Sequence, residues 1–151
     1  MRLSQKIASL SLAALMAACS DSASQTSTMS NAAANDFMSQ MGPNGDRVFF
    51  ALNKSDVTIE GQETLTRQAT WLNANPSVAV AIEGHCDVRG TDAYNMGLGE
   101  RRANSTKNYL VALGLQPTRA EIISYGKGRP AVLGNDETAH AQNRRSVTVV
   151  R

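Results

Sequence analysis

The pattern of apolar and polar residues predicts short strands and amphipathic helices in the chain after residue 45. Apolar side chains alternate over residues 48–52 and 78–86, as expected of strands that bury one face. Between them, Thr58 is a candidate N-cap for a helix that runs to about residue 75, where Pro76 prevents its continuation. The first three elements are therefore strand, helix and strand, and the helix carries one apolar face formed by Leu65, Ala69 and Leu72.

The same pattern continues to the C-terminus. A second helix is predicted from residue 92 or 94 to residue 113, with Gly114 suited to the position after its end. Strands follow over residues 122–125 and 147–150, with a short helix over 139–144 between them. Units of this kind fold into one sheet with helices packed on it. The predicted fold class is α+β with a small mixed sheet, and the buried stripe of the second helix is Ala103, Thr106, Leu110 and Leu113.

The first residues are typical of an export signal. Arg2 and Lys6 accompany an apolar run over residues 7–18, which is shorter than the about 20 residues of a membrane-spanning helix. The run ends in a sequence that resembles a lipobox, which predicts cleavage after residue 18 and lipidation of Cys19. An ordinary signal peptide with a chance cysteine is the alternative. The resembling sequence is Leu15-Met16-Ala17-Ala18-Cys19.

Residues 20–45 are rich in Ser, Thr, Asn, Ala, Gln and Met and contain almost no large apolar groups. Such a segment buries too little surface to offset its ordering entropy, so it is predicted to be a flexible linker. The predicted organisation is a lipoprotein signal peptide over 1–18, the lipidated cysteine with its linker over 19–45, and one domain over 46–151. The last segment is long enough for a domain with its own core.

Two cysteines would normally form a disulfide in an oxidising compartment. If Cys19 carries lipid, Cys86 has no intramolecular partner. Cys86 ends an apolar strand pattern and is interpreted as a partly buried thiol.

Charge is distributed unevenly along the chain. Residues 19–100 contain four basic and ten acidic side chains, whereas residues 101–151 contain nine basic and three acidic ones. The basic residues are spread over helices and strands, and aromatic residues make up only 5% of the chain. Nucleic-acid-binding surfaces cluster basic groups and often interleave aromatics. We therefore expect no nucleic-acid partner, and interpret the asymmetry as intramolecular complementarity plus a site for a zwitterion.

The candidate binding site lies where the second strand passes into the second helix. Asp87 follows the strand, and Asn95, Leu98 and Arg102 have the spacing of one helix face. If this face points toward the strand end, a carboxylate and a guanidinium meet in one volume, which suits a ligand with an ammonium and a carboxylate. Amides of the turn over 88–92 can add hydrogen bonds to a second carboxylate. A purely structural Asp–Arg ion pair is the commoner alternative on the residues alone.

This stretch closely resembles the OmpA-like domain family, and the resemblance covers roughly residues 46–151. It implies a βαβα(α)β(α)β sandwich in which Asp87 and Arg102 hold the diaminopimelate residue of peptidoglycan. Asn95, Leu98 and Thr91 complete the implied site. The motifs that carry the resemblance are Gly84 to Ala103, Val48-Phe49-Phe50, Ser124-Tyr125-Gly126-Lys127 with Arg129-Pro130, and Asn143-Arg144-Arg145, whose two arginines are implied to be a structural pair outside the site.

The resemblance also implies location and partners. Related lipoproteins of the Tol system bind peptidoglycan and the proteins TolB, a periplasmic β-propeller, and TolA, and they support envelope integrity and constriction at cell division. Ser20, rather than Asp, after the lipidated cysteine implies the periplasmic side of the outer membrane. We therefore expect a non-enzymatic tether between outer membrane and cell wall, with no cofactor and no metal.

Other interpretations use the same residues. A cell-wall hydrolase would need flanking carboxylates, such as Asp87 with Asp92 or Glu100, but no nucleophile and base can be assembled around them. A zinc site built from His85, Asp87 and His140 lacks a ligand pair at metal-site spacing. A protein-binding lipoprotein with a structural Asp–Arg pair is the remaining alternative, and a failure to bind peptidoglycan sacculi would favour it.

Overall fold

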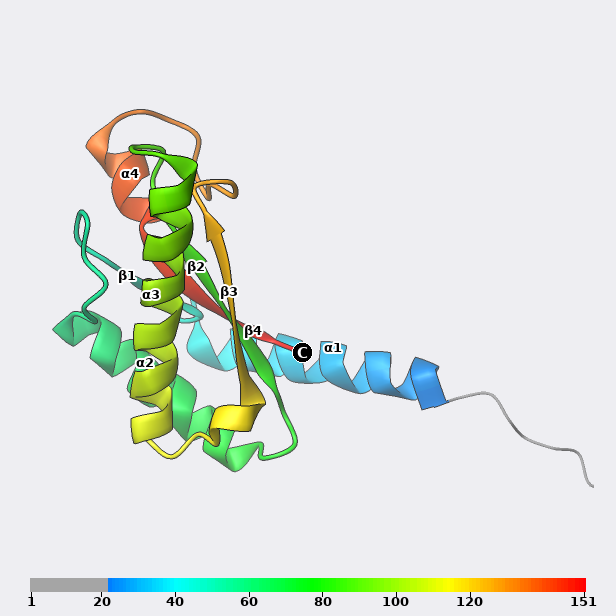
Figure 1. The fold of residues 1–151 in the computed structure, drawn as a ribbon. Coiled ribbons are helices and arrows are strands. Elements are labelled where there is room, and N and C mark those ends of the chain that lie inside the picture. Colours follow the sequence, from blue (N-terminus) through cyan, green and yellow to red (C-terminus); the bar gives the residue numbers. More distant parts are fainter. Residues whose placement is uncertain (1–21) are drawn as a thin grey trace, which may run out of the picture.

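The computed structural model describes residues 22–151, so the predicted signal peptide and Cys19 lie outside the described residues. All the elements predicted after residue 45 are present, with ends shifted by a few residues, whereas the first helix and the 3-10 helix were not predicted. In chain order (Figure 1) the elements are α1 (Ser22–Met41), β1 (Arg47–Phe49), α2 (Ile59–Ala74), β2 (Val80–His85), α3 (Asp92–Ala112), η1 (Pro117–Arg119), β3 (Ala120–Gly126), α4 (Glu137–Asn143) and β4 (Arg145–Val150).

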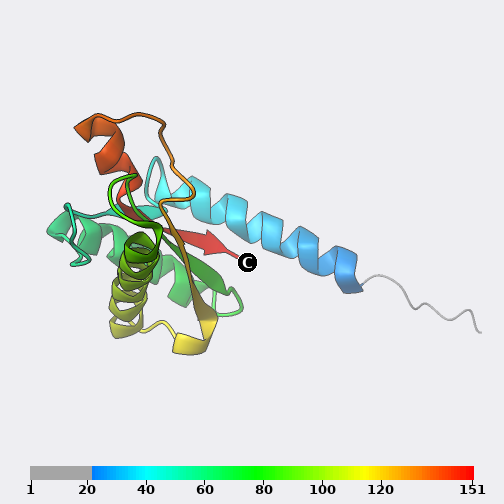
Figure 2. The same cartoon turned by 45° about the horizontal axis from the view of Figure 1, so that its top comes forward.

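The four strands form one sheet in the order β1-β4-β2-β3. Strand β4 is antiparallel to both of its neighbours, and β2 and β3 are parallel. The sheet is therefore mixed, and α2 and α3 pack against it (Figures 1 and 2). This arrangement confirms the predicted α+β class with helices on a small mixed sheet.

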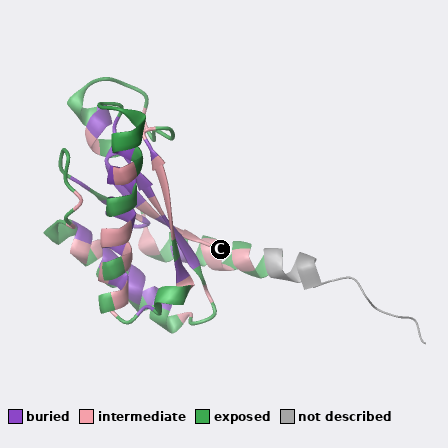
Figure 3. Ribbon diagram, in the orientation of Figure 1, coloured by how far each residue is buried: buried purple, intermediate pink, exposed green. Residues whose placement is uncertain are grey.

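The core lies between these helices and the sheet, where β2 is almost entirely buried whereas most of β3 is only partly buried (Figure 3). The predicted face of α2 is confirmed, because Leu65, Ala69 and Leu72 are all buried. The side chain of Thr58 caps this helix by accepting a hydrogen bond from the amide of Gly61 at 3.2 Å. The stripe of α3 is also confirmed for Ala103, Thr106 and Leu110, which are buried, while Leu113 is partly buried.

Residues 22–41 form helix α1, so the prediction of a flexible linker is wrong for this part of the chain. Phe37 is buried and packs edge-on against Trp71 of α2, with 5.1 Å between ring centroids. Ala33 and Met41, one turn before and one turn after Phe37, pack against the same core. A single apolar stripe at helical spacing is therefore enough to dock α1, although the average composition of the segment is polar.

The N-terminal part of α1 extends away from the rest of the fold (Figures 1 and 2). Met29, in this projecting part, is 74% exposed. Within residues 22–151, no helix combines the length and the apolar content needed to cross a membrane.

Two glycines bring α3 unusually close to β2. A Cβ atom on Gly84 would lie 1.8 Å from the carbonyl oxygen of Gly99, and one on Gly99 would lie 2.4 Å from Oγ of Ser124. Real Cβ atoms essentially never come within 3.0 Å of another heavy atom in this way, so both positions depend on the missing side chain. Gly84 and Gly99 therefore allow α3 to pack directly against β2. This close packing sets the position of the α3 residues of the candidate site relative to Asp87.

Candidate functional site

The structure brings the predicted residues of strand and helix together. Asp87, Asn95, Leu98 and Arg102 line one small space at the end of β2. This confirms that the predicted stripe of α3 faces the strand end. The space is only about 10 Å³, which is about the room that one water molecule needs. Its walls must therefore move before a larger group can enter. The other residues that line it are Leu52, Asn53, Cys86 and Arg89.

Asp87 is paired with Arg89, two residues further along the loop. Its carboxylate accepts hydrogen bonds from Nη2 of Arg89 at 2.6 Å, from Nε at 3.2 Å and from the main-chain amide of Arg89 at 3.1 Å. Burial raises the pKa of Asp87, but the hydrogen bonds and charge of Arg89, with a contribution from Arg144, outweigh it and hold the pKa below its ordinary value. Asp87 is therefore a buried carboxylate that stays negatively charged.

Arg102 has a different set of partners. Its guanidinium donates from Nε to the carbonyl of Lys54 at 2.9 Å, from Nη1 to that of His85 at 2.9 Å and from Nη2 to that of Ala51 at 3.2 Å. The side chain is 0% exposed, and burial lowers its pKa. No ion pair joins Arg102 to Asp87 within the described residues. Arg102 therefore ties the loop after β1 to the end of β2.

Arg144, which the resemblance implied to be a structural residue, does not line the small space but contacts Asp87. Its Nη1 is 3.4 Å from a carboxylate oxygen of Asp87, and its Nη2 is 2.8 Å from Glu137 of α4. Glu137 also lies 3.5 Å from Nη1 of Arg89. The four side chains thus form a closed ring of alternating charge. Arg145 stays outside this ring and donates to main-chain carbonyls, as the resemblance implied for a structural residue.

Asn95 and Thr91 shape the loop that carries Arg89. The side-chain amide of Asn95 donates to the carbonyls of Arg89 and Thr91 at 2.8 and 3.0 Å. Thr91 is the N-cap of α3, and its Oγ1 accepts from the amide of Tyr94 at 3.2 Å. Gly90, between Arg89 and Thr91, adopts a φ of +89°, a left-handed backbone conformation that favours glycine. Thr91 is exposed and does not line the small space, so its role here is to hold the loop.

The groups considered for metal binding do not assemble. Within residues 22–151, no three His, Cys, Asp or Glu side chains come close enough to hold an ion. Cys86 is buried, its Sγ lies 3.4 Å from the carbonyl oxygen of Asn95, and burial raises the pKa of its thiol. The thiol is therefore more deeply buried than predicted and forms part of the wall of the site.

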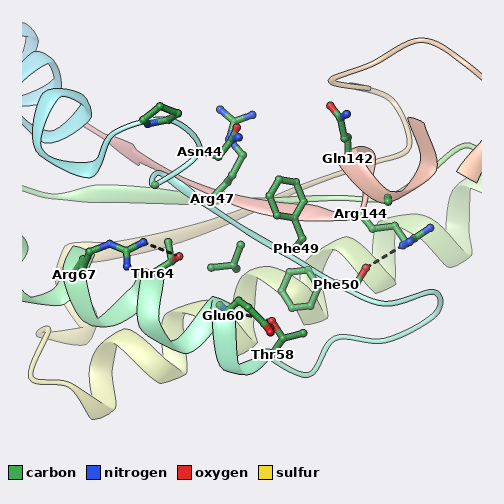
Figure 4. A pocket seen from close by; sticks show the side chains of 15 residues that line it. Asn44, Arg47, Phe49, Phe50, Thr58, Glu60, Thr64, Arg67, Gln142 and Arg144 are labelled. Carbon is green, nitrogen blue, oxygen red and sulfur yellow. Dashed lines mark hydrogen bonds between the residues drawn. The ribbon is translucent and has the colours of Figure 1, made fainter. Parts of the chain in front are cut away.

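A larger groove of about 580 Å³ lies between β1, α2 and the end of α4 (Figure 4). Phe49 and Phe50 from the β1 segment form an apolar wall, and Thr64 and Arg67 of α2 lie opposite (Figure 4). It shares no lining residue with the space around Asp87. Arg144 connects the two, because it lines the groove and its guanidinium contacts Asp87. The sequence did not indicate this groove, since its walls come from segments far apart in the chain.

Comparison with known proteins identifies relatives of the whole fold. The peptidoglycan-associated lipoprotein of Haemophilus influenzae is 41% identical over 138 residues, which cover 89% of each chain. That of Agrobacterium fabrum is 44% identical over 106 residues, which cover 70% of this chain but only 60% of the relative's length. The crystal structure of the peptidoglycan-associated lipoprotein from Burkholderia pseudomallei superposes with a TM-score of 0.69 at 36% identity, covering 70% of this chain and 90% of that one.

A more distant structure shares the fold alone. The C-terminal domain of Helicobacter pylori MotB superposes with a TM-score of 0.65 at 18% identity, covering 70% of this chain and 84% of that one. A family model described as the OmpA family matches residues 49–144, which run from the last residue of β1 through α4 and contain all four members of the charged ring. The chain therefore belongs to the OmpA family.

Proposed function

We propose that this protein is a lipoprotein of the outer membrane that binds peptidoglycan non-covalently and tethers the membrane to the cell wall. The relatives named above as peptidoglycan-associated lipoproteins support the coarse assignment. The single observation that carries the site is the buried carboxylate of Asp87, held in its charged form at the edge of a small space.

The proposed ligand is the diaminopimelate residue of the stem peptide. Its side chain ends in a carbon atom that carries both an ammonium and a carboxylate. Asp87 is the partner for the ammonium, and Leu98 and Asn95 form the wall beside it. Arg102 uses three of its five N–H groups on main-chain carbonyls, so the remaining two can donate to a ligand once the space opens.

The site supports binding rather than catalysis. The pKa of Asp87 lies below its ordinary value, which is the opposite of what a general acid at neutral pH requires. Asp92 and Glu100 are exposed on α3 and do not line the space with Asp87, so they do not form the carboxylate pair of a glycosidase there.

Location and partners extend the proposal. Lipidation of Cys19 would anchor the chain, and several acyl chains together give a stable anchor at about 0.8 kcal/mol per buried methylene. Helix α1 would then carry the domain away from the membrane surface, since its N-terminal part projects from the fold (Figure 1). We place the protein in the Tol system, with TolB and TolA as its protein partners and a role in envelope integrity and cell division.

Binding to purified sacculi tests the proposal. Asp87→Asn removes the negative charge with little change in size, and truncating a desolvated charge contact typically costs about 2–5 kcal/mol, or roughly 30-fold or more in affinity. The matched control is Asp92→Asn, because the Asp92 side chain is 86% exposed. Free diaminopimelate should compete with sacculi for the unmodified protein. Unchanged sacculus binding by a folded Asp87→Asn variant would refute the proposed site.

A further inference from the structure

We propose that the groove between β1 and α2 binds an extended peptide segment of another protein, which adds to the sheet as a strand beside β1. The segment carries acidic side chains on either side of an apolar one. This surface is separate from the proposed peptidoglycan site, because the groove shares no lining residue with the space around Asp87. Its strand edge, its apolar wall and its charges together select this kind of partner.

Strand β1 lies at the edge of the sheet formed by residues 22–151, with β4 as its neighbour on one side. The amide of Phe50 donates to the carbonyl of Arg144 at 2.8 Å, and the carbonyl of Asp46 accepts from the amide of Thr148 at 2.8 Å. Because the bonds of an antiparallel ladder involve every second residue of a strand, the amide and the carbonyl of Phe49 point away from β4. They can exchange both hydrogen bonds with one residue of an added antiparallel strand.

The side chains of the β1 segment point alternately to its two faces. Val48 and Phe50 are buried, whereas Phe49 is 39% exposed and lines the groove. Gly61 of α2 lies against Val48, since a Cβ atom on Gly61 would be 3.6 Å from Cβ of Val48. This position of α2 therefore adds no side chain to the groove. An apolar side chain opposite Phe49 would form a cross-strand pair of the kind that stabilises a sheet.

The charged side chains of the groove favour an acidic partner. Three arginines and one acid line it, namely Arg47, Arg67, Arg144 and Glu60. Arg47 and Arg67 lie toward one end of the groove and Arg144 toward the other (Figure 4). Arg47 and Arg144 already contact carboxylates of the protein. Arg67 forms no ion pair within residues 22–151 and donates only to Oγ1 of Thr64 at 3.1 Å, so its charge is available to an acidic ligand.

The geometry of β1 defines the order of side chains in the partner. Arg47 and Phe49 are two residues apart, so they project from the same face of the strand. The residue opposite Phe49 should be β-branched or aromatic, and the residue two positions away, opposite Arg47, should be acidic. The groove volume of about 580 Å³ lies within the range of about 300–1,000 Å³ that is usual for ligand sites, so the groove holds a short segment rather than a domain surface.

Synthetic peptides with matched changes test the inference. The first probe is the acidic peptide Glu-Thr-Val-Thr-Glu, with both ends blocked and a fluorescent label, and the second replaces both glutamates by lysine. Two further acidic peptides carry one N-methyl group, either on the valine or on the threonine that follows it. With the valine opposite Phe49, the valine amide faces β1 and the threonine amide faces solvent, so the second methylated peptide is the control for the first.

Affinities are measured by fluorescence polarisation with the unmodified full chain, with Arg67→Glu and with Arg101→Glu. Arg67 and Arg101 are exposed helix residues, so the two variants make the same charge change on different surfaces. Arg144 is left unchanged because it also contacts Asp87. Folding of each variant is checked by circular dichroism.

We expect the unmodified protein to bind the acidic peptide about tenfold or more tightly than the lysine peptide. Arg67→Glu should bind the acidic peptide about tenfold more weakly, because an attraction is replaced by a repulsion, whereas Arg101→Glu should bind it as the unmodified protein does. N-methylation of the valine should weaken binding about tenfold, which is roughly the loss of one hydrogen bond, and N-methylation of the threonine should not.

Other results would overturn the inference. Absence of binding by the acidic peptide, or equal binding of the lysine peptide, would show that the groove does not select an acidic segment. Equal affinities of the two N-methylated peptides would show that no strand is added beside Phe49. Equal losses in Arg67→Glu and Arg101→Glu would place the peptide outside the groove. Displacement of the bound peptide by soluble peptidoglycan fragments would assign the groove to peptidoglycan instead of a protein segment.

Discussion

The indole Nε1 of Trp71 donates a hydrogen bond of 2.8 Å to a carboxylate oxygen of Asp36, which fixes the last turns of α1 to α2. The neighbouring ring of Phe37 meets the Trp71 ring edge-on and is only 1% exposed. The two contacts set the direction in which α1 leaves the domain. In the proposed tether, this junction would transmit any pull from the membrane to the peptidoglycan-binding domain.

Phe37→Ala should detach α1 from the domain. Removing a buried Phe side chain costs about 3–5 kcal/mol in a core, and α1 has few other apolar contacts to compensate. Residues 33–41 should then exchange their amide hydrogens faster, and the fluorescence of Trp71, the only Trp in the chain, should shift to the red. Met38→Ala, next to Phe37 but 46% exposed, should change neither. Equal protection of residues 33–41 in both variants would contradict the docking role of Phe37.

Alanine at two neighbouring glycines of α3 should have opposite effects. Gly99→Ala places a Cβ 2.4 Å from Oγ of Ser124 and 3.0 Å from the carbonyl oxygen of Gly84, which should destabilise the fold by about 1–3 kcal/mol. At Gly97 the nearest atom is the flexible end of Arg101 at 3.4 Å, so Gly97→Ala should gain up to about 1 kcal/mol of helix propensity. Urea denaturation measures both. A stable Gly99→Ala variant would show that helix and strand can separate without cost.

The periodic parts of the fold could be predicted from the sequence. The faces of α2 and α3 were readable because Leu65, Leu72 and Leu110 recur at helical spacing and are completely buried. Helix α1 was missed because its stripe is sparse. Ala33, Phe37 and Met41 are the apolar groups that dock it, and their spacing of four residues is hidden by the polar average of the segment.

The partners within the site could be predicted only in part. The helix face that contains Arg102 was identified correctly. Arg102, however, donates hydrogen bonds to main-chain carbonyls of a distant loop. Such bonds cannot be predicted from the sequence, because every residue has a main-chain carbonyl. Arg144 is 57 residues from Asp87 and only the sheet brings them together. Arg89 was overlooked although an opposite charge two residues after Asp87 was a usable local signal.

Arg102 should be required for stability independently of any ligand. Arg102→Ala would leave the carbonyls of Lys54, His85 and Ala51 without their donor, and each buried unsatisfied group costs about 1–3 kcal/mol. We expect a loss of at least about 3 kcal/mol in the free energy of unfolding. Arg102→Lys keeps the charge but cannot reach three carbonyls, so it should also be destabilised. Arg101 is exposed, so Arg101→Ala should change the free energy of unfolding by no more than about 0.5 kcal/mol. An equally small change for Arg102→Ala would contradict the structural role of Arg102.

His85 should make the fold less stable in mild acid. Burial, together with the positive charge of Arg145, lowers the pKa of His85 from 6.5 to about 4. Its ring is 2% exposed, and neither nitrogen has a hydrogen-bond partner in the described part of the chain, although Nε2 lies 3.6 Å from Glu83. Protonation would therefore place an added charge among arginines in a buried position.

The direction of the pH dependence follows from the two pKa values. Between pH 6.5 and about 4 the unfolded chain binds a proton at His85 that the folded protein does not, so stability falls as the pH is lowered through this range and the effect levels off below about pH 4. At about 1.4 kcal/mol per pKa unit, the full loss is on the order of 3 kcal/mol. His85→Phe keeps a ring against Tyr125, which lies 5.4 Å away between centroids, but removes the titration. Urea unfolding of the unmodified protein and of His85→Phe is measured from pH 7 to pH 4. The free energy of unfolding should fall less for His85→Phe, and the difference should be about that amount. If both proteins lose stability in parallel, carboxylates rather than His85 cause the acid sensitivity.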